Sequence, residues 1–124
     1  MTLQYLVFDH SEDTEGGGVF DAMASTGPQQ APAVLAEVAQ VLDWAHATFP
    51  GQRAPIEEGG EWDFDLQAVQ EVATPQRIDY DVDRRAFDVR PGTPGLTRHT
   101  VTLSIGGTGA FCEAFRSRFA AALP

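Results

Sequence analysis

The sequence predicts an α+β fold with an antiparallel sheet, and three observations support this fold class. Several segments alternate apolar and polar residues with a period of two, which is typical of half-buried strands. Two other segments repeat apolar residues at helical spacing. The connections between the predicted strands are too short for repeated parallel crossovers. We therefore expect a two-layer sandwich, in which a mainly antiparallel sheet of five or six strands packs two helices on one face.

Two strands and a helix are predicted in the N-terminal half. Residues 3–8 and 19–25 have the composition of strands, and the acidic, glycine-rich residues 9–18 between them predict a loose hairpin. Residues 34–49 then carry an apolar stripe at helical spacing. The stripe consists of Val34, Leu35, Val38, Val41, Leu42, Ala45 and Phe49. Polar residues of the same segment, Glu37 among them, are expected to lie toward solvent.

The C-terminal half predicts further strands and a second helix. The expected strands are residues 61–69, 78–82, 86–89 and 99–105, separated by segments rich in proline and glycine. In the last segment the apolar residues recur every four positions: Phe111, Phe115, Phe119 and Leu123. Thr108 precedes this segment at the position where a hydroxyl oxygen can cap the first turn of a helix.

Length and composition set further expectations. The 124 residues match a common domain size, so we expect a single domain over residues 1–124. No segment has the run of about 18 apolar residues that a transmembrane helix needs, and the first residues lack the features of a signal peptide. The single cysteine, Cys112, excludes an internal disulfide and is compatible with a reducing compartment. A cytoplasmic protein without membrane contact or a cofactor is the resulting expectation.

Carboxylates alternate with bulky apolar residues in two of the predicted strands. The first of these strands contains Asp63 and Asp65, and the second contains Asp79 and Asp81. Since successive side chains of a strand point to opposite faces, each strand can bury its apolar residues and present its aspartates to water. If the two strands are neighbours, these carboxylates form one acidic face. A solvated face, a recognition surface and a site for acid-base catalysis are the interpretations that remain open.

Two further segments contain candidate ligand-binding residues. Asp9, His10, Asp13 and Asp21 surround the predicted first hairpin, and clustered oxygens of this kind suit hard cations. The spacing does not match a calcium-binding loop, so a flexible acidic loop is the alternative. Near the C-terminus, residues 106–109 join a strand to a helix and could cradle an anion through their N–H groups. This segment is Gly106, Gly107, Thr108 and Gly109, and a tight turn with a helix cap is the alternative.

The charge of the chain restricts the classes of function. The formal net charge is −10, and this excess of carboxylates disfavours binding to nucleic acids or anionic membranes. All eight basic residues are arginine, so chemistry that requires a lysine is excluded. We expect a non-enzymatic protein-interaction or regulatory module whose acidic surface binds a basic protein partner. The alternative is a small metal-dependent or acid-base enzyme with carboxylates near the first hairpin, and a homodimer also remains open.

Overall fold

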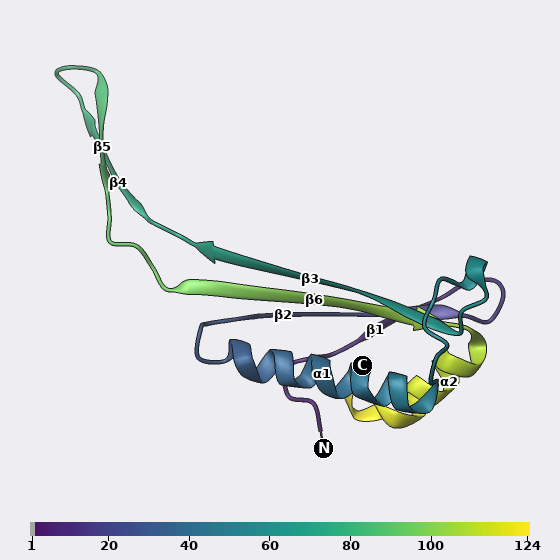
Figure 1. Cartoon of the computed structure of the whole chain (residues 1–124). Helices are drawn as coiled ribbons and strands as arrows, with labels where there is room; N and C mark the ends of the chain where they lie inside the picture. The colour runs from purple at the N-terminus through teal and green to yellow at the C-terminus, as the bar shows by residue number, and fades with distance from the viewer. Residues whose placement is uncertain (1) are drawn as a thin grey trace.

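The computed structural model describes residues 2–124, in which six strands and two α-helices form the regular structure (Figure 1). The strands are β1 (Asp9–Glu12), β2 (Gly18–Thr26), β3 (Trp62–Val72), β4 (Gln76–Asp81), β5 (Ala86–Pro91) and β6 (Thr97–Gly107). The helices are α1 (Ala31–Thr48) and α2 (Gly109–Arg118), with two short 3-10 helices, η1 (Ile56–Glu58) and η2 (Ala120–Ala122). None of the helices within residues 2–124 has the length and hydropathy needed to cross a membrane.

Four of the strands form one antiparallel sheet in the order β1-β2-β6-β3, and both α-helices lie on the same face of this sheet (Figure 1). The predicted α+β class and two-layer arrangement are therefore confirmed. The remaining strands, β4 and β5, pair only with each other. The six strands are thus divided between a four-stranded and a two-stranded sheet, whereas the sequence suggested a single one. We call the helix-covered side of the four-stranded sheet its inner face and the opposite side its outer face.

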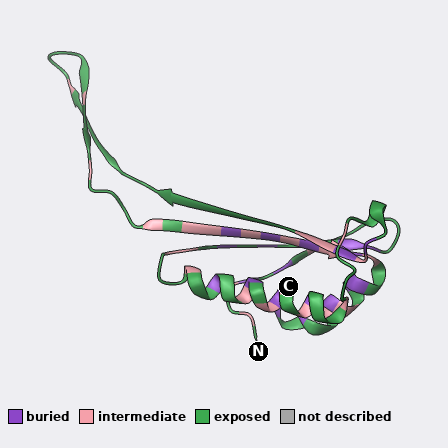
Figure 2. Ribbon diagram, in the orientation of Figure 1, coloured by how far each residue is buried: buried purple, intermediate pink, exposed green. Residues whose placement is uncertain are grey.

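The two-stranded sheet lies in a long projection, residues 73–96, which we call the arm. Its strands continue the β3–β6 ribbon, because the N–H of Gly95 donates to the carbonyl of Ala73 and that of Gly92 to Pro75, both at 2.8 Å. Figure 1 shows the arm extending beyond β2 and α1 and bending away from the helical layer. Within the described chain no residue of the arm is buried, and the arm is almost entirely in the exposed colour of Figure 2. We call the rest of the chain the body.

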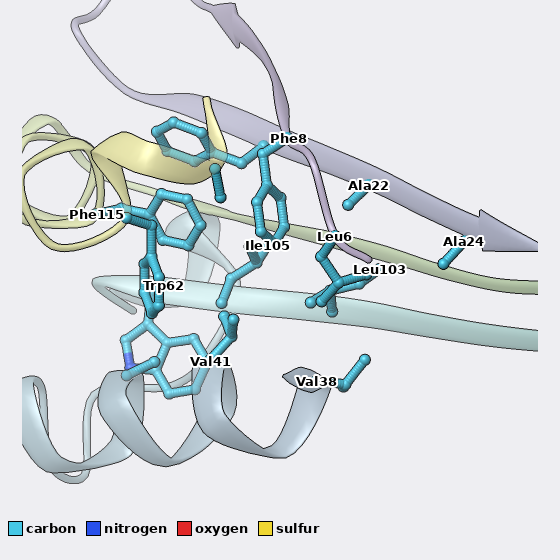
Figure 3. Close-up of a cluster of buried hydrophobic side chains, with 14 of the residues drawn as sticks. Leu6, Phe8, Ala22, Ala24, Val38, Val41, Trp62, Leu103, Ile105 and Phe115 are labelled. Carbon is cyan, nitrogen blue, oxygen red and sulfur yellow. The ribbon is translucent and has the colours of Figure 1, made fainter. Parts of the chain in front are cut away.

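The hydrophobic core lies in the body, between the inner face and the helices (Figure 3). Four residues of the predicted α1 stripe are buried, namely Val34, Val38, Val41 and Ala45, whereas Leu35 is half exposed. Trp62 at the start of β3 is fully buried, and its indole N–H donates to the carbonyl of Phe49 at 3.3 Å. The predicted cap of α2 is confirmed, because Thr108 Oγ1 accepts from the N–H of Phe111.

The expectation of a strand at residues 3–8 is wrong. These residues form no strand, and β1 begins only at Asp9, inside the stretch that was expected to be a loop. The reason is that the carboxylate of Glu37 on α1 accepts hydrogen bonds from three successive N–H groups, those of Gln4 at 2.8 Å, Tyr5 at 3.0 Å and Leu6 at 3.1 Å. Backbone donors satisfied in this way need no neighbouring strand. Glu37 is therefore a structural link and not a solvent-facing residue.

Candidate interaction surfaces

The register of the four-stranded sheet places four polar side chains in one row across the outer face. Asp9 pairs with Asp21, Asp21 with Ser104, and Ser104 with Asp65. Directly opposed residues of antiparallel strands point to the same face, so three carboxylates share this row. The Ser104 hydroxyl donates a hydrogen bond to Asp21. Because like charges in directly opposite positions destabilise a sheet, the pair of Asp9 and Asp21 costs stability and leaves an acidic surface.

Asp63 lies on the same face, one row closer to the start of β3, but it already has a cationic partner. The Arg53 guanidinium contacts Asp63 Oδ1 at 2.9 Å and lies over the ring of Phe64, 4.4 Å from its centroid. Asp65 contacts no cation among the described residues and accepts only from the amide of Gln67, at 3.0 Å. Asp65 is consequently the more available of the two carboxylates.

The other two residues of the predicted acidic face, Asp79 and Asp81, lie on β4 in the arm. Since β4 does not pair with β3, the four aspartates do not form one surface. Asp81 closes the turn at the tip of the arm, where its carboxylate accepts from the backbone N–H of Arg84 at 3.1 Å and from the guanidinium at 2.9 Å. These two hydrogen bonds lower the pKa of Asp81 below its usual 3.8, with the backbone N–H as the larger cause.

The four residues of the proposed cation site do not converge either. Asp9 and Asp21 point to the outer face, whereas His10 points to the inner face and stacks on Phe20 with a centroid distance of 4.3 Å. Asp13 is used within the hairpin loop, because its Oδ1 accepts from the N–H groups of residues 15 and 17. Across residues 2–124 no three His, Cys, Asp or Glu side chains are placed to hold one metal ion.

A carboxylate of the chain itself occupies the neighbourhood of the predicted anion loop. Thr108 donates its hydroxyl to Glu61 Oε2 at 2.5 Å and its N–H to the Glu61 carbonyl at 3.0 Å. A negative charge at this position opposes the binding of a phosphate. The glycines have a packing role instead, since a Cβ on Gly106 would overlap the carbonyl of Gly18 and one on Gly107 would overlap that of Glu61.

The single cysteine, Cys112, is not placed to act as a nucleophile. It is buried between α2 and the sheet, and its Sγ lies 3.6 Å from the carbonyl oxygens of Gly18 and Gly107. Burial raises the pKa of the thiol above its usual 9.0. A buried, protonated thiol is a poor nucleophile, so Cys112 belongs to the core.

An uncovered apolar surface lies on the arm, and it is not among the sites predicted from the sequence. In the β4–β5 register Ile78 pairs with Val89, and Tyr80 pairs with Phe87, so all four side chains share one face. The rings of Tyr80 and Phe87 lie 5.1 Å apart, yet these residues are 53% and 65% exposed. The regular alternation of these strands is the signal in the sequence, but it predicts burial of the apolar residues, whereas the structure leaves them exposed.

The opposite face of the hairpin is polar and gives little support to the pairing. Arg77 pairs directly with Arg90, and Asp79 pairs directly with Asp88, so like charges face each other. The ion pairs run along each strand instead, at 3.9 Å between Arg77 and Asp79 and at 2.9 Å between Arg90 and Asp88. Exposed pairs of this kind contribute about 0–1 kcal/mol. A two-stranded hairpin with these properties is marginally stable when nothing covers its apolar face.

Charge is distributed unevenly between the arm and the body. The arm contains four arginines and four aspartates: Arg77, Arg84, Arg85, Arg90, Asp79, Asp81, Asp83 and Asp88. It therefore has no formal net charge, and the body carries the whole charge of −10. The molecule thus combines an acidic body with a neutral arm that contains half of its arginines.

Comparisons with protein-family models, curated proteins and solved structures found no match to this chain. The function is therefore inferred from the two surfaces described above, the apolar face of the arm and the acidic outer face of the sheet.

Proposed function

We propose that this protein is a non-enzymatic protein-interaction module that binds its partner through the arm and the acidic outer face. The observation that carries the proposal is the uncovered apolar face of the arm, formed by Ile78, Val89, Tyr80 and Phe87. An apolar surface held away from the core does not stabilise the body of the protein, whereas it can be buried against a partner.

The energetics of the arm agree with a binding role. Ordering a residue costs about 1–2 kcal/mol of backbone entropy, and full burial of a large apolar side chain returns about 1.5–3 kcal/mol. In the free protein most of this stabilisation by burial is absent, because the apolar side chains of the arm are about half exposed or more. A partner that covers these side chains provides the missing stabilisation. Aromatic residues such as Tyr80 and Phe87 are also enriched in the cores of protein interfaces.

The chemistry of the outer face indicates what the partner must offer. Asp9, Asp21 and Asp65 are exposed, and the body as a whole repels anions. A partner with arginine or lysine side chains next to an apolar strip complements both surfaces, and opposite charges accelerate association and disfavour anionic competitors. This chemistry supports a protein partner that presents basic side chains at the contact, and it disfavours a nucleic acid.

No specific observation favours the enzymatic alternative. The carboxylates near the first hairpin point to opposite faces of the sheet or are used within the loop, so no acid-base pair converges on a shared cavity there. We therefore propose a single function.

Photocrosslinking in cells that produce the protein tests this proposal. A photoreactive phenylalanine analogue replaces Phe87, which lies on the apolar face, or Asp88, which lies on the opposite face as a matched control. We expect a covalent protein adduct from position 87 and little from position 88. The adduct should weaken with Asp21→Asn plus Asp65→Asn, since these substitutions remove the charge of the outer face. The absence of a protein adduct at position 87, or equal yields from both positions, would refute the proposal.

A further inference from the structure

We infer that the arm docks on the outer face of a second copy of this chain, in a two-fold symmetric dimer. This inference rests on the proposed function and names its partner. Both of the required surfaces occur on one chain, so a symmetric pair uses each of them twice and leaves neither arm uncovered.

The lengths of the arm and the sheet match. Strand β3 has 11 residues and spans about 36 Å at about 3.3 Å per residue. Residues 73–83, from the end of β3 to the tip of the arm, are equally numerous and span the same length when extended. Figure 1 also shows that the arm bends toward the outer side of the sheet, away from the helices. When two copies align in opposite directions, each arm can follow the whole outer face of the other copy.

The outer face has a shape that accepts an extended hairpin. The central strand β6 presents only small side chains over most of its length, and the flanking strands β2 and β3 present larger ones. The small residues are Thr100, Thr102, Ser104 and Gly106, and the larger ones include Val19, Met23, Asp65, Gln67 and Val69. Met23 is 66% exposed although it is a large apolar residue. From these side-chain sizes we infer a shallow trough along β6, with Val19, Met23 and Val69 among the side chains that flank it, in which Tyr80 and Phe87 of a second copy can be buried.

The tip of the arm would meet complementary chemistry at the far end of the trough. An open cavity of about 280 Å³ lies there, and Val19, Ile56 and Asp65 contribute to its lining. The tip presents Val82, which is 74% exposed, and Arg85, which forms no ion pair among residues 2–124. An apolar side chain and a free guanidinium thus face a cavity with apolar walls and an exposed carboxylate.

The distribution of charge favours contact through the arms. Two bodies that each carry the full −10 repel one another, so a dimer that joins body to body directly is disfavoured. A neutral arm placed between them separates the acidic faces and brings one arginine that is unpaired within the described chain, Arg85 at the tip, to the carboxylates. The arm of a second copy therefore offers an apolar surface with a cationic group at its tip.

Light scattering coupled to size-exclusion chromatography tests the inference on the full chain. We expect a mass of twice the 13.4 kDa of one chain at high protein concentration, with dissociation on dilution. Tyr80→Ser combined with Phe87→Ser should weaken the dimer by about a hundredfold or more, because it removes two aromatic contacts at each of two equivalent sites. Both residues lie outside the core, so the monomer should remain folded.

A charge exchange identifies the docking site. Arg85→Glu and Asp65→Arg should each weaken the dimer by about tenfold, because each creates two repulsive contacts by symmetry. An equimolar mixture of the two variants should restore dimers, since a mixed dimer contains one original and one reversed pair, both attractive. Arg118→Glu is the matched control, because it changes the net charge equally on α2, remote from the arm, and should leave the dimer unchanged.

The outcomes separate this inference from the proposed function. A monomer at every concentration overturns the dimer, and the arm would then bind another protein, which the photocrosslinked adduct would contain. A dimer that tolerates the Tyr80 and Phe87 substitutions, or whose charge variants are not restored by mixing, also overturns docking of the arm on the outer face. Without any adduct from position 87, the proposed function itself fails.

Discussion

Removal of the arm should leave the body folded and nearly as stable as the intact chain. The excision replaces residues 73–96 by an Asn-Gly turn that joins Val72 to Thr97, which are directly opposed at the end of the β3–β6 ladder. A two-residue turn of this type matches the twist of antiparallel strands. The four-stranded sheet and both helices are kept.

The magnitude follows from the burial of the arm. All of the fully buried core residues lie in the body, so the excision removes none of them. No side chain of the arm, residues 73–96, packs against the core, so the arm is a separate, marginally stable hairpin whose removal takes no contact from the body. We therefore expect the free energy of unfolding of the body to change by less than about 1 kcal/mol. Trp62→Ala is the contrasting variant, with an expected loss of about 3–5 kcal/mol because Trp62 is completely buried.

Urea unfolding followed by tryptophan fluorescence measures both effects, because Trp44 and Trp62 both lie in the body. The protein is kept dilute so that association does not contribute to the measured stability. The m-value should fall by much less than the fraction of the chain removed, since the arm is already exposed in the folded state. A loss of several kcal/mol, or an m-value that falls in proportion to chain length, would refute the independence of the body from the arm.

Three further predictions concern single side chains. Glu37→Ala should lower the free energy of unfolding by about 2 kcal/mol, because three backbone N–H groups lose a charged acceptor. In the same urea titration the control Asp43→Ala, on the exposed side of the helix, should cost less than about 0.5 kcal/mol. Equal losses in the two variants would contradict the role of Glu37. The thiol of Cys112 should react with an aromatic disulfide reagent only after unfolding, and fast labelling of the folded protein would contradict its burial. Because the pKa of this thiol is raised, its contribution to the free energy of unfolding is present below pH 9.0 and is lost as the pH rises above that value. In nitrogen-proton NMR spectra, the chemical shift of the Arg84 amide should change with pH with a midpoint below 3.8, because this amide donates to Asp81, whose pKa is lowered. The ionised carboxylate stabilises the turn above that midpoint, and the stabilisation is lost as the pH falls through it. Asp81→Asn should abolish this titration, and its persistence in that variant would assign it to another group.

The sequence predicted the candidate surfaces only in part. The period of two correctly placed Asp63 and Asp65 together on one side of a strand, because that alternation is a property of the backbone. The same rule places Asp9 and His10 on opposite faces of β1. The sequence, however, predicted the first strand at residues 3–8 and a loop at these two residues. That assignment failed because Glu37, distant in sequence, satisfies the N–H groups of residues 4–6.

The arm illustrates what local patterns leave open. Alternation of aspartates with apolar residues is the same in β3 and in β4, yet Trp62 is fully buried and Tyr80 is half exposed. Whether an apolar strand face is covered depends on which elements lie over it, and this is decided by contacts between residues that are far apart in the chain. The sequence therefore could not distinguish a strand of the body from a strand of the arm.

By itself, the sequence determined the α+β class, the helical stripe of α1, the Thr108 cap of α2 and the acidic charge, because each depends on local periodicity, hydrogen bonding or composition. The tertiary structure alone decided the strand order, and with it the row that joins Asp9, Asp21 and Asp65 across the outer face. It also decided that β4 and β5 leave the sheet and expose their apolar face. Strand pairing and coverage are long-range properties, since they depend on loop closure and on the packing of helices against one face.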